Sequence, residues 1–260
     1  MSGSWGNWAT ANEHAAGAAS PPVVTGAGSN APLEPAYLLH RRPYRETSAL
    51  LEVFTHGHGR IALVARGARR PRSALRAALT PFVPLLVSWS GRGEVGTLRG
   101  AEAQGPAVSM SGDALLSGLY LNELLMRLIH RHDPHPELFE AYREAIGALG
   151  AGVDTEFTLR VFEKRMLESI GYALLLDREA GSGLPVVREQ RYAYRADHGP
   201  DPAAAPSRNC VEVSGATLLA LAGEQPLDDI GRREAKRLMR FVLRVHLGER
   251  PLVTRAMFGG

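Results

Sequence analysis

Residues 36–65 read AYLLHRRPYRETSALLEVFTHGHGRIALVA, and this stretch decides the fold of the first half of the chain. Its apolar residues alternate in three short segments, 36–42, 50–55 and 60–65, which is the pattern of half-buried β-strands. The HGHG turn at 56–59 joins the second and third segments, and its glycines permit the positive φ angles of a tight hairpin. Leu51 and Val53 should point inward, and Ile61 and Leu63 should share one face.

Two further strands follow at residues 82–89 and 94–101, joined by the GRG turn at 91–93. Five short strands at close spacing predict a small antiparallel β-barrel. An OB-fold is the first expectation and an SH3-like barrel the main alternative. The aromatic residues Phe54, Phe82 and Trp89 lie in apolar strands and are expected in the core.

Beyond residue 106 the apolar spacing changes to about 3.6 residues, which indicates helices. We expect helices at 113–132, 137–149, 155–170, 216–222 and 230–247. The fold class is therefore α+β, with a small antiparallel barrel followed by a mainly α-helical domain. The domain boundaries that we predict are a disordered N-terminal tail at 1–34, the barrel at 35–105 and the helical domain at 106–260. A polar insert at 177–213 has a two-stranded ribbon at 190–196 and 210–213.

Charge is distributed unevenly along the chain. Residues 35–105 hold 11 basic and 4 acidic residues, a net charge of +7, whereas residues 106–213 hold 11 basic and 16 acidic residues. A basic block of this kind predicts a polyanionic partner, and the alternative is a solvated basic surface. Arginine forks match phosphate oxygens without reading bases.

Two groups of residues are the candidate DNA-binding site. The first lies on a loop after the third strand and comprises Arg66, Arg69, Arg70, Arg72 and Arg76. The second lies at the end of the first strand and comprises Arg41, Arg42, Tyr44 and Arg45. Tyr44 could stack on a base or pack over the end of the barrel. Because few other exposed aromatic residues are expected, the protein should recognise the sugar–phosphate backbone of DNA rather than its base sequence.

The last helix carries a further basic stripe. Arg233, Arg237, Arg240 and Arg244 follow one another at intervals of four, three and four residues, so they share one helical face. The stripe could be a second nucleic-acid surface or a surface for an acidic partner. An ordinary solvated helix face is the alternative.

Several classes of protein find no support in the sequence. No apolar run approaches the ~18 residues of a membrane helix, and residues 1–34 show no signal peptide, so we expect a cytoplasmic, nucleoid-associated protein. Cys210 is the only cysteine, which excludes an internal disulfide and a cysteine-based zinc site. His130, His132 and His135 straddle a helix end, which argues against a metal site. No nucleotide-binding or hydrolase motif occurs. We expect neither enzyme activity nor a cofactor.

Six segments together resemble the RecO family of recombination mediators. They lie at residues 39–48, 66–73, 119–125, 134–139, 159–163 and 246–252, in the order in which the family has them. The resemblance implies an OB-fold joined to a helical domain, without catalytic residues. It also implies binding of single- and double-stranded DNA, annealing of complementary strands, and loading of the RecA recombinase onto coated strands.

Partners are also implied by this resemblance. They are the mediator RecR and the acidic C-terminal tail of single-strand-binding protein. The edge of the helical domain that would take this tail is expected around Tyr120, Leu124, Arg127, Arg131 and Arg165. Many family members carry a four-cysteine zinc finger where this chain has residues 177–213, so the chain resembles the zinc-free branch. From the residues alone, an RNA-binding OB-fold protein without catalytic activity remains the alternative.

Overall fold

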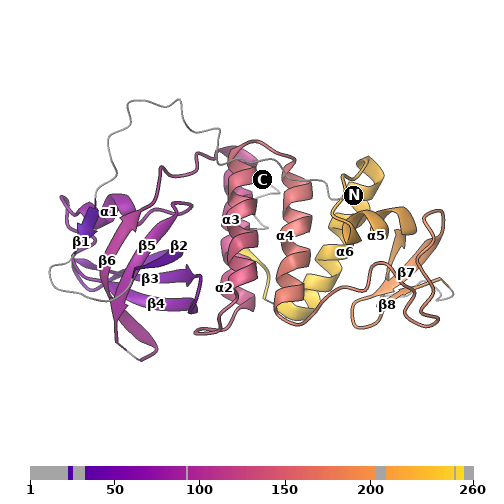
Figure 1. The fold of residues 1–260 in the computed structure, drawn as a ribbon, viewed down its shortest axis with the longest axis horizontal. Coiled ribbons are helices and arrows are strands. Elements are labelled where there is room, and N and C mark those ends of the chain that lie inside the picture. Colours follow the sequence, from indigo (N-terminus) through magenta and orange to yellow (C-terminus); the bar gives the residue numbers. More distant parts are fainter. Residues whose placement is uncertain (1–22, 26–32, 92, 203–208, 249, 255–260) are drawn as a thin grey trace.

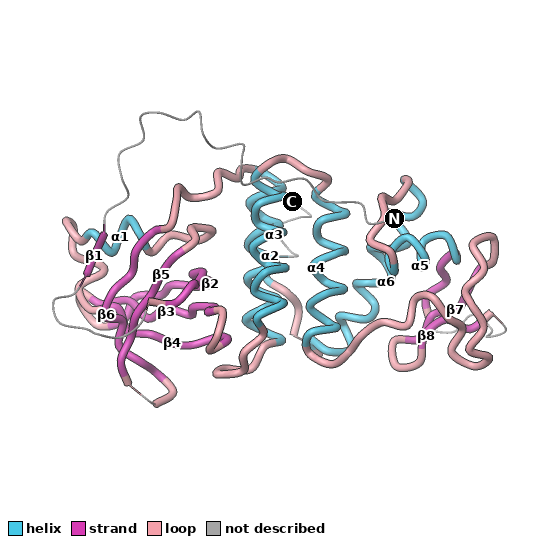
Figure 2. Tube along the Cα trace, viewed as in Figure 1, coloured by secondary structure: helices cyan, strands magenta, loops and turns pink. Residues whose placement is uncertain are grey.

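The computed structural model describes residues 23–25, 33–91, 93–202, 209–248 and 250–254. It is an elongated molecule with a β-barrel at one end, a layer of helices in the middle and a small sheet at the other end (Figures 1 and 2). The α+β class is confirmed. The barrel strands are β2 (Glu34–Tyr44), β3 (Ser48–Thr55), β4 (Gly59–Ala65), β5 (Leu85–Ser90) and β6 (Val95–Ala103).

The barrel closes as an OB-fold. Strands β2, β3 and β4 form an antiparallel meander, β5 pairs with both β2 and β6, and β6 pairs with β4. The β4–β6 pair is parallel, whereas the other strand pairs of the barrel are antiparallel, as predicted. A parallel closure needs a long connection, which here contains the short helix α1 (Ala74–Ala78) that the sequence did not predict. The Greek-key order favours the OB-fold over the SH3-like alternative.

The predicted disordered tail contains one strand. β1 (Val23–Thr25) pairs antiparallel with β6, with Val24 opposite Ala101. Three residues are too few for an alternating pattern, and main-chain hydrogen bonds at a sheet edge need no particular side chains. The prediction therefore fails at these residues, while 1–22 and 26–32 lie outside the described part of the chain.

The barrel wall has two apolar faces. Leu38, Leu51, Val53, Ile61 and Leu63 fill the interior, as the alternation predicted for the last four. Tyr37, Leu39 and Phe54 point outward and belong to the core of the helical domain instead. The Phe54 ring lies 5.5 Å from Phe139 and the Tyr37 ring lies 5.1 Å from Tyr142. The barrel is thus fixed to the helices by aromatic packing.

Phe82 and Trp89 differ from the expectation in their setting. Phe82 precedes β5, has a φ of +65°, and packs against Gly118 of the first long helix, so it is buried between the domains rather than in a strand. A Cβ at position 118 would lie 2.9 Å from the Phe82 ring, which explains the glycine. Trp89 is half-buried against the barrel core and meets His58 edge-on.

Five helices form the second domain: α2 (Gly112–Leu128), α3 (Pro136–Gly150), α4 (Thr155–Ser169), α5 (Gly215–Ala222) and α6 (Asp229–Leu247). All five were predicted, and the caps explain three of their starts. Asp154 accepts from Phe157 N, Ser214 from Thr217 N and Asp228 from Gly231 N.

Helix α2 ends four residues before the predicted end at His132. Residues 129–132 leave the helix to lie along β4, where His132 N donates to Arg60 O and Arg60 Nε donates to Ile129 O. Arg60 and Arg131 both pair with Glu52 on β3. Pairing with the barrel therefore ends the helix before Pro134 does.

The insert is a three-stranded sheet of β7 (Arg191–Arg195), β8 (Gly199–Asp201) and β9 (Val211–Ser214). Tyr192 and Tyr194 on β7 are each 1% exposed and join the core of the helical domain. No group of three or more metal-binding side chains occurs among the described residues. In the same part of the chain, no helix is both long and apolar enough to cross a membrane. Aromatic packing holds the insert, and the expected lack of zinc stays a prediction.

Candidate nucleic-acid interface

The two basic groups of the barrel form one surface. The turn at 45–47 between β2 and β3 lies against the segment 66–73 that follows β4. Arg69 N donates to Thr47 O at 2.9 Å, and Arg69 Nη1 donates to Arg45 O at 3.1 Å and to Glu46 O at 3.2 Å. These hydrogen bonds join segments more than 20 residues apart, so the candidate residues of both groups meet.

We call this region the barrel-end surface. Seven of its arginines are exposed: Arg42, Arg45, Arg66, Arg69, Arg70, Arg72 and Arg76. Ion pairs among the described residues involve other arginines and leave these seven without a carboxylate partner. Glu46 is the only acidic residue in the two segments, so the surface carries a large excess of positive charge.

Arg41 differs from the exposed arginines around it in its burial and in its hydrogen bonds. Its guanidinium is half-buried and donates to Ala68 O at 3.2 Å and Leu79 O at 3.4 Å. It thereby fixes the backbone on which the exposed arginines stand. Arg41 is therefore less accessible to an external ligand than the exposed arginines, and its expected contact with DNA stays a prediction.

Tyr44 is accessible at the edge of the same surface. Its side chain is 37% exposed, and the Arg45 guanidinium lies 5.3 Å from the ring centre. Arg45 has a φ of +53°, an uncommon conformation for a residue with a side chain. The exposure favours the stacking interpretation of Tyr44 over packing across the barrel end, and the pair with Arg45 places an aromatic face beside a cation.

The barrel-end surface points away from the helical domain. Ser48 begins β3 at this surface, and Thr55 ends β3 beside the helices, where His56 meets Phe139 with ring centres 5.5 Å apart. Ser48 and Thr55 are seven rises of about 3.3 Å apart, which separates the two ends of β3 by about 23 Å. The barrel-end surface therefore lies at the end of β3 that is remote from the helices.

The stripe on α6 is also open. Arg233, Arg237, Arg240 and Arg244 are all exposed, as their spacing predicted. Arg237 Nη2 donates to Glu212 O at 2.5 Å, and the Arg244 guanidinium lies 5.9 Å from the Phe241 ring centre. The stripe thus runs beside the edge of the insert sheet.

The residues expected to bind the partner tail do not form an open site. Tyr120 is 6% exposed and donates to Glu163 Oε1, while Leu124 is 0% exposed, so the prediction is wrong for these two core side chains. Helical periodicity could not distinguish the face toward the core from a rim. Arg131 is paired with Glu52 of the barrel.

Arg127 and Arg165 are likewise engaged within the chain. Arg127 donates to Leu247 O and Arg250 O, both at 2.8 Å, and so holds the C-terminal segment on α2. Hydrogen bonds from Arg165 to Glu224 and Glu144 hold its pKa above the ordinary value for arginine. A tail peptide would have to compete with these partners.

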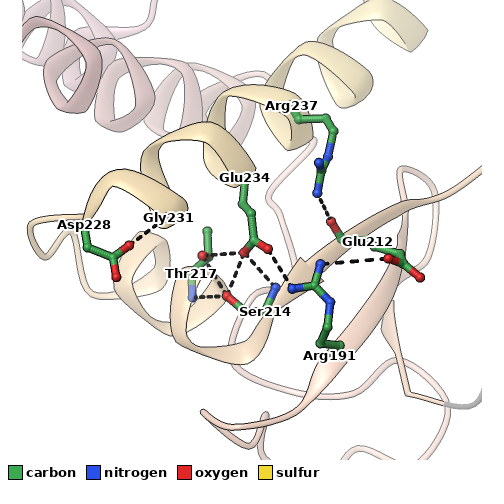
Figure 3. A network of polar contacts seen from close by, with 8 residues as sticks. All are labelled: Arg191, Glu212, Ser214, Thr217, Asp228, Gly231, Glu234 and Arg237. Carbon is green, nitrogen blue, oxygen red and sulfur yellow. Dashed lines mark hydrogen bonds and ion pairs between the residues drawn. The ribbon is translucent and has the colours of Figure 1, made fainter.

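A carboxylate network that the sequence analysis missed holds the insert on α6 (Figure 3). Glu234 accepts hydrogen bonds from Ser214 N at 2.9 Å, Ser214 Oγ at 2.7 Å, Thr217 Oγ1 at 2.8 Å and Arg191 Nη1 at 2.9 Å. Burial alone would raise the pKa of Glu234, but these four donors lower it to about 2. No local pattern reveals the contact, because the donors come from β7, β9 and α5.

Comparison with known proteins gives the same two-part division. The family model described as "Recombination protein O N terminal" matches residues 33–106, and "Recombination protein O C terminal" matches residues 110–256. A protein of Methylococcus capsulatus named "DNA repair protein RecO" is 54% identical over 87% of this chain and 92% of its own length. A protein of the same name from Nitrosospira multiformis is 46% identical over 86% of this chain and 93% of its own length.

Proposed function

The chain belongs to the RecO family of DNA repair proteins, and from this premise we propose that it is a recombination mediator that holds DNA on its barrel-end surface. It binds single- and double-stranded DNA, anneals complementary strands and helps to load the RecA recombinase onto strands coated by single-strand-binding protein. It does so as a binding protein and not as an enzyme, near the nucleoid in the cytoplasm.

One observation carries this proposal. The turn at 45–47 and the segment at 66–73 are joined by the hydrogen bonds of Arg69, which brings seven exposed arginines onto one end of the barrel, none of them paired with a carboxylate of the described residues. Guanidinium forks suit phosphate oxygens, and such contacts position a strand without reading its bases. Tyr44 at the edge supports stacking of an unpaired base. Sequence-neutral binding of this kind is what strand annealing requires.

The helical domain is proposed to bind the protein partners, RecR and the acidic tail of single-strand-binding protein. The stripe on α6 supplies cations on its surface, and Arg165 could take part only after releasing Glu224 and Glu144. Arg127 and Arg131 could take part only after releasing Leu247 O and Glu52, their present partners. Titration of wild type and Arg165→Ala with a labelled tail peptide tests this assignment, and unchanged affinity would place the tail on another edge.

The proposed DNA site is tested by its salt dependence. The variant Arg66→Ala, Arg70→Ala, Arg72→Ala removes three exposed guanidinia and keeps Arg69, which holds the two segments together. Each phosphate contact on a single strand contributes about −0.7 to the slope of log affinity against log salt, so the slope should flatten by up to about 2. Affinity should fall for all sequences alike, and annealing should fail in parallel.

A matched control removes the same charge elsewhere. Arg99, Arg143 and Arg188 are exposed on other surfaces, and their triple alanine variant should keep the wild-type slope. Both variants should melt close to wild type, because exposed charges contribute little to stability. An unchanged slope in the folded barrel variant would move the DNA site off this surface. Competition between DNA and RNA strands of equal length separates the mediator from an RNA-binding protein.

A further inference from the structure

The arginine stripe of α6 lies far from the barrel-end surface. Helix α6 packs on α2, α4, α5 and β9, and the layer of α2, α3 and α4 separates it from the barrel (Figure 1). A strand on the barrel-end surface therefore leaves the stripe free. The two basic surfaces can act independently of each other.

The stripe is not neutralised along its length. The only acidic residue between positions 233 and 244 is Glu234, which is 5% exposed and whose carboxylate is occupied by Ser214, Thr217 and Arg191. Two other cations of the helix have carboxylate partners: Arg232 pairs with Asp154 and Lys236 pairs with Glu156. With the Glu234 carboxylate buried and hydrogen-bonded, no exposed acidic residue stands between Arg233 and Arg244 along the helix.

The acidic residue beside Arg237 does not neutralise the stripe either. Glu212 on β9 lies beside Arg237, but the arginine contacts its main-chain oxygen, whereas the carboxylate lies 3.9 Å from Arg191 (Figure 3). Among the described residues, Arg233, Arg240 and Arg244 have no carboxylate within 4 Å. Three free guanidinia remain on one line.

The spacing of the stripe suits an extended polyanion. Arg233 and Arg244 at the ends of the stripe are eleven positions apart, and a rise of 1.5 Å per residue makes the stripe about 16 Å long. Neighbouring side chains at intervals of three or four residues stand about 5–6 Å apart. Regular cations at this spacing can follow several phosphates of one strand. A short acidic peptide would need only one or two of them.

We propose that the stripe is a second nucleic-acid site, so that one molecule holds two strands at once, one on the barrel and one on α6. This proposal rests on the proposed function and specifies where on the molecule each of the two strands would bind. Two polyanionic strands repel each other, and annealing requires them to be held within reach of one another. Two separate basic surfaces on one rigid chain meet this requirement without a second copy of the protein.

The test is bridging of two strands that cannot pair. Oligothymidine strands labelled with a donor or an acceptor dye are mixed with excess strand over protein, and energy transfer reports two strands on one complex. Wild type should give transfer. The variant Arg233→Ala, Arg240→Ala, Arg244→Ala should lose most of it and keep its affinity for the first strand within about twofold. Arg237 is left in place because it also contacts the insert.

The control variant Arg99→Ala, Arg143→Ala, Arg188→Ala should keep wild-type transfer, since it removes the same charge from β6, α3 and the insert and leaves the arginines of α6 in place. Full transfer by the stripe variant overturns the proposal, because bridging would then come from two barrels of two copies. Loss of binding to a polyglutamate peptide with intact bridging would make the stripe a protein site instead. If Arg66→Ala, Arg70→Ala, Arg72→Ala leaves first-strand affinity unchanged, the proposed function fails separately.

Discussion

Replacing Glu234 by glutamine should destabilise the helical domain by about 3 kcal/mol at pH 7. The carboxylate accepts from four donors on three elements, and an amide offers one oxygen in place of two. The amide nitrogen would face Ser214 or Arg191 and add an unmatched donor. This contact and the two buried tyrosines fasten the insert to the helical domain.

The magnitude follows from the pKa of Glu234, which falls from 4.5 to about 2 on folding. A difference of one pKa unit corresponds to about 1.4 kcal/mol, so the charged form is stabilised by roughly 3 kcal/mol. Because the folded pKa is the lower one, this stability is present above pH 4.5 and is lost as the pH falls toward 2. The deficit of the glutamine variant should therefore shrink to about half at pH 3.

Urea unfolding followed by circular dichroism at 222 nm, at pH 7 and pH 3, measures both quantities. Glu212→Gln is the matched control, because its carboxylate is 55% exposed and lies 3.9 Å from the same Arg191. The control should stay within about 0.5 kcal/mol of wild type at both pH values. The reasoning is refuted if the two variants unfold alike at pH 7, or if the deficit of Glu234→Gln grows as the pH falls.

Three further outcomes are expected. Gly59→Ala should destabilise the protein by more than ~2 kcal/mol, since φ is +65° and the new Cβ would lie 1.9 Å from Asp133 O. Thermal melting checks it, and Gly57→Ala should cost less, because its φ is not positive and its Cβ would meet only the Glu34 side chain, at 3.2 Å. Elemental analysis of protein purified without chelator should find no stoichiometric zinc, and one zinc per chain would contradict the metal-free insert. Removal of residues 1–32 should change affinity for single-stranded DNA by less than about tenfold, or ~1.4 kcal/mol, because those residues hold no Lys or Arg.

Local patterns were sufficient for most of the secondary structure. The alternation at 50–55 and 60–65 predicted β3, β4 and the inward positions of Leu51 and Val53, because strand periodicity depends only on neighbouring residues. Helical spacing and capping residues predicted all five long helices of the second domain. The basic character of the candidate interface and the shared face of the α6 arginines were also readable in this way.

Features that depend on residues distant in the chain could not be predicted from the sequence. β1 exists because β6 offers it an edge, and α2 ends at Leu128 because the next residues pair with β4. Neither event has a local signal. Helical periodicity gave the apolar stripe of α2, but only the packed helices decide that Tyr120 and Leu124 are core rather than rim.

The sequence by itself determined which residues of the candidate site are cationic and on which segments they stand. The tertiary structure decided which of them are free. Local sequence does not distinguish Arg41, Arg127 and Arg165 from their neighbours, yet backbone oxygens or carboxylates engage their guanidinium groups. Six arginines of the barrel end are exposed without such a partner in the described part of the chain, and Arg69 is exposed but donates to Arg45 O and Glu46 O. The physical reason is that composition and periodicity are properties of short segments. Pairing and burial are set by contacts across 20 to 120 residues, which form only when the whole chain has folded.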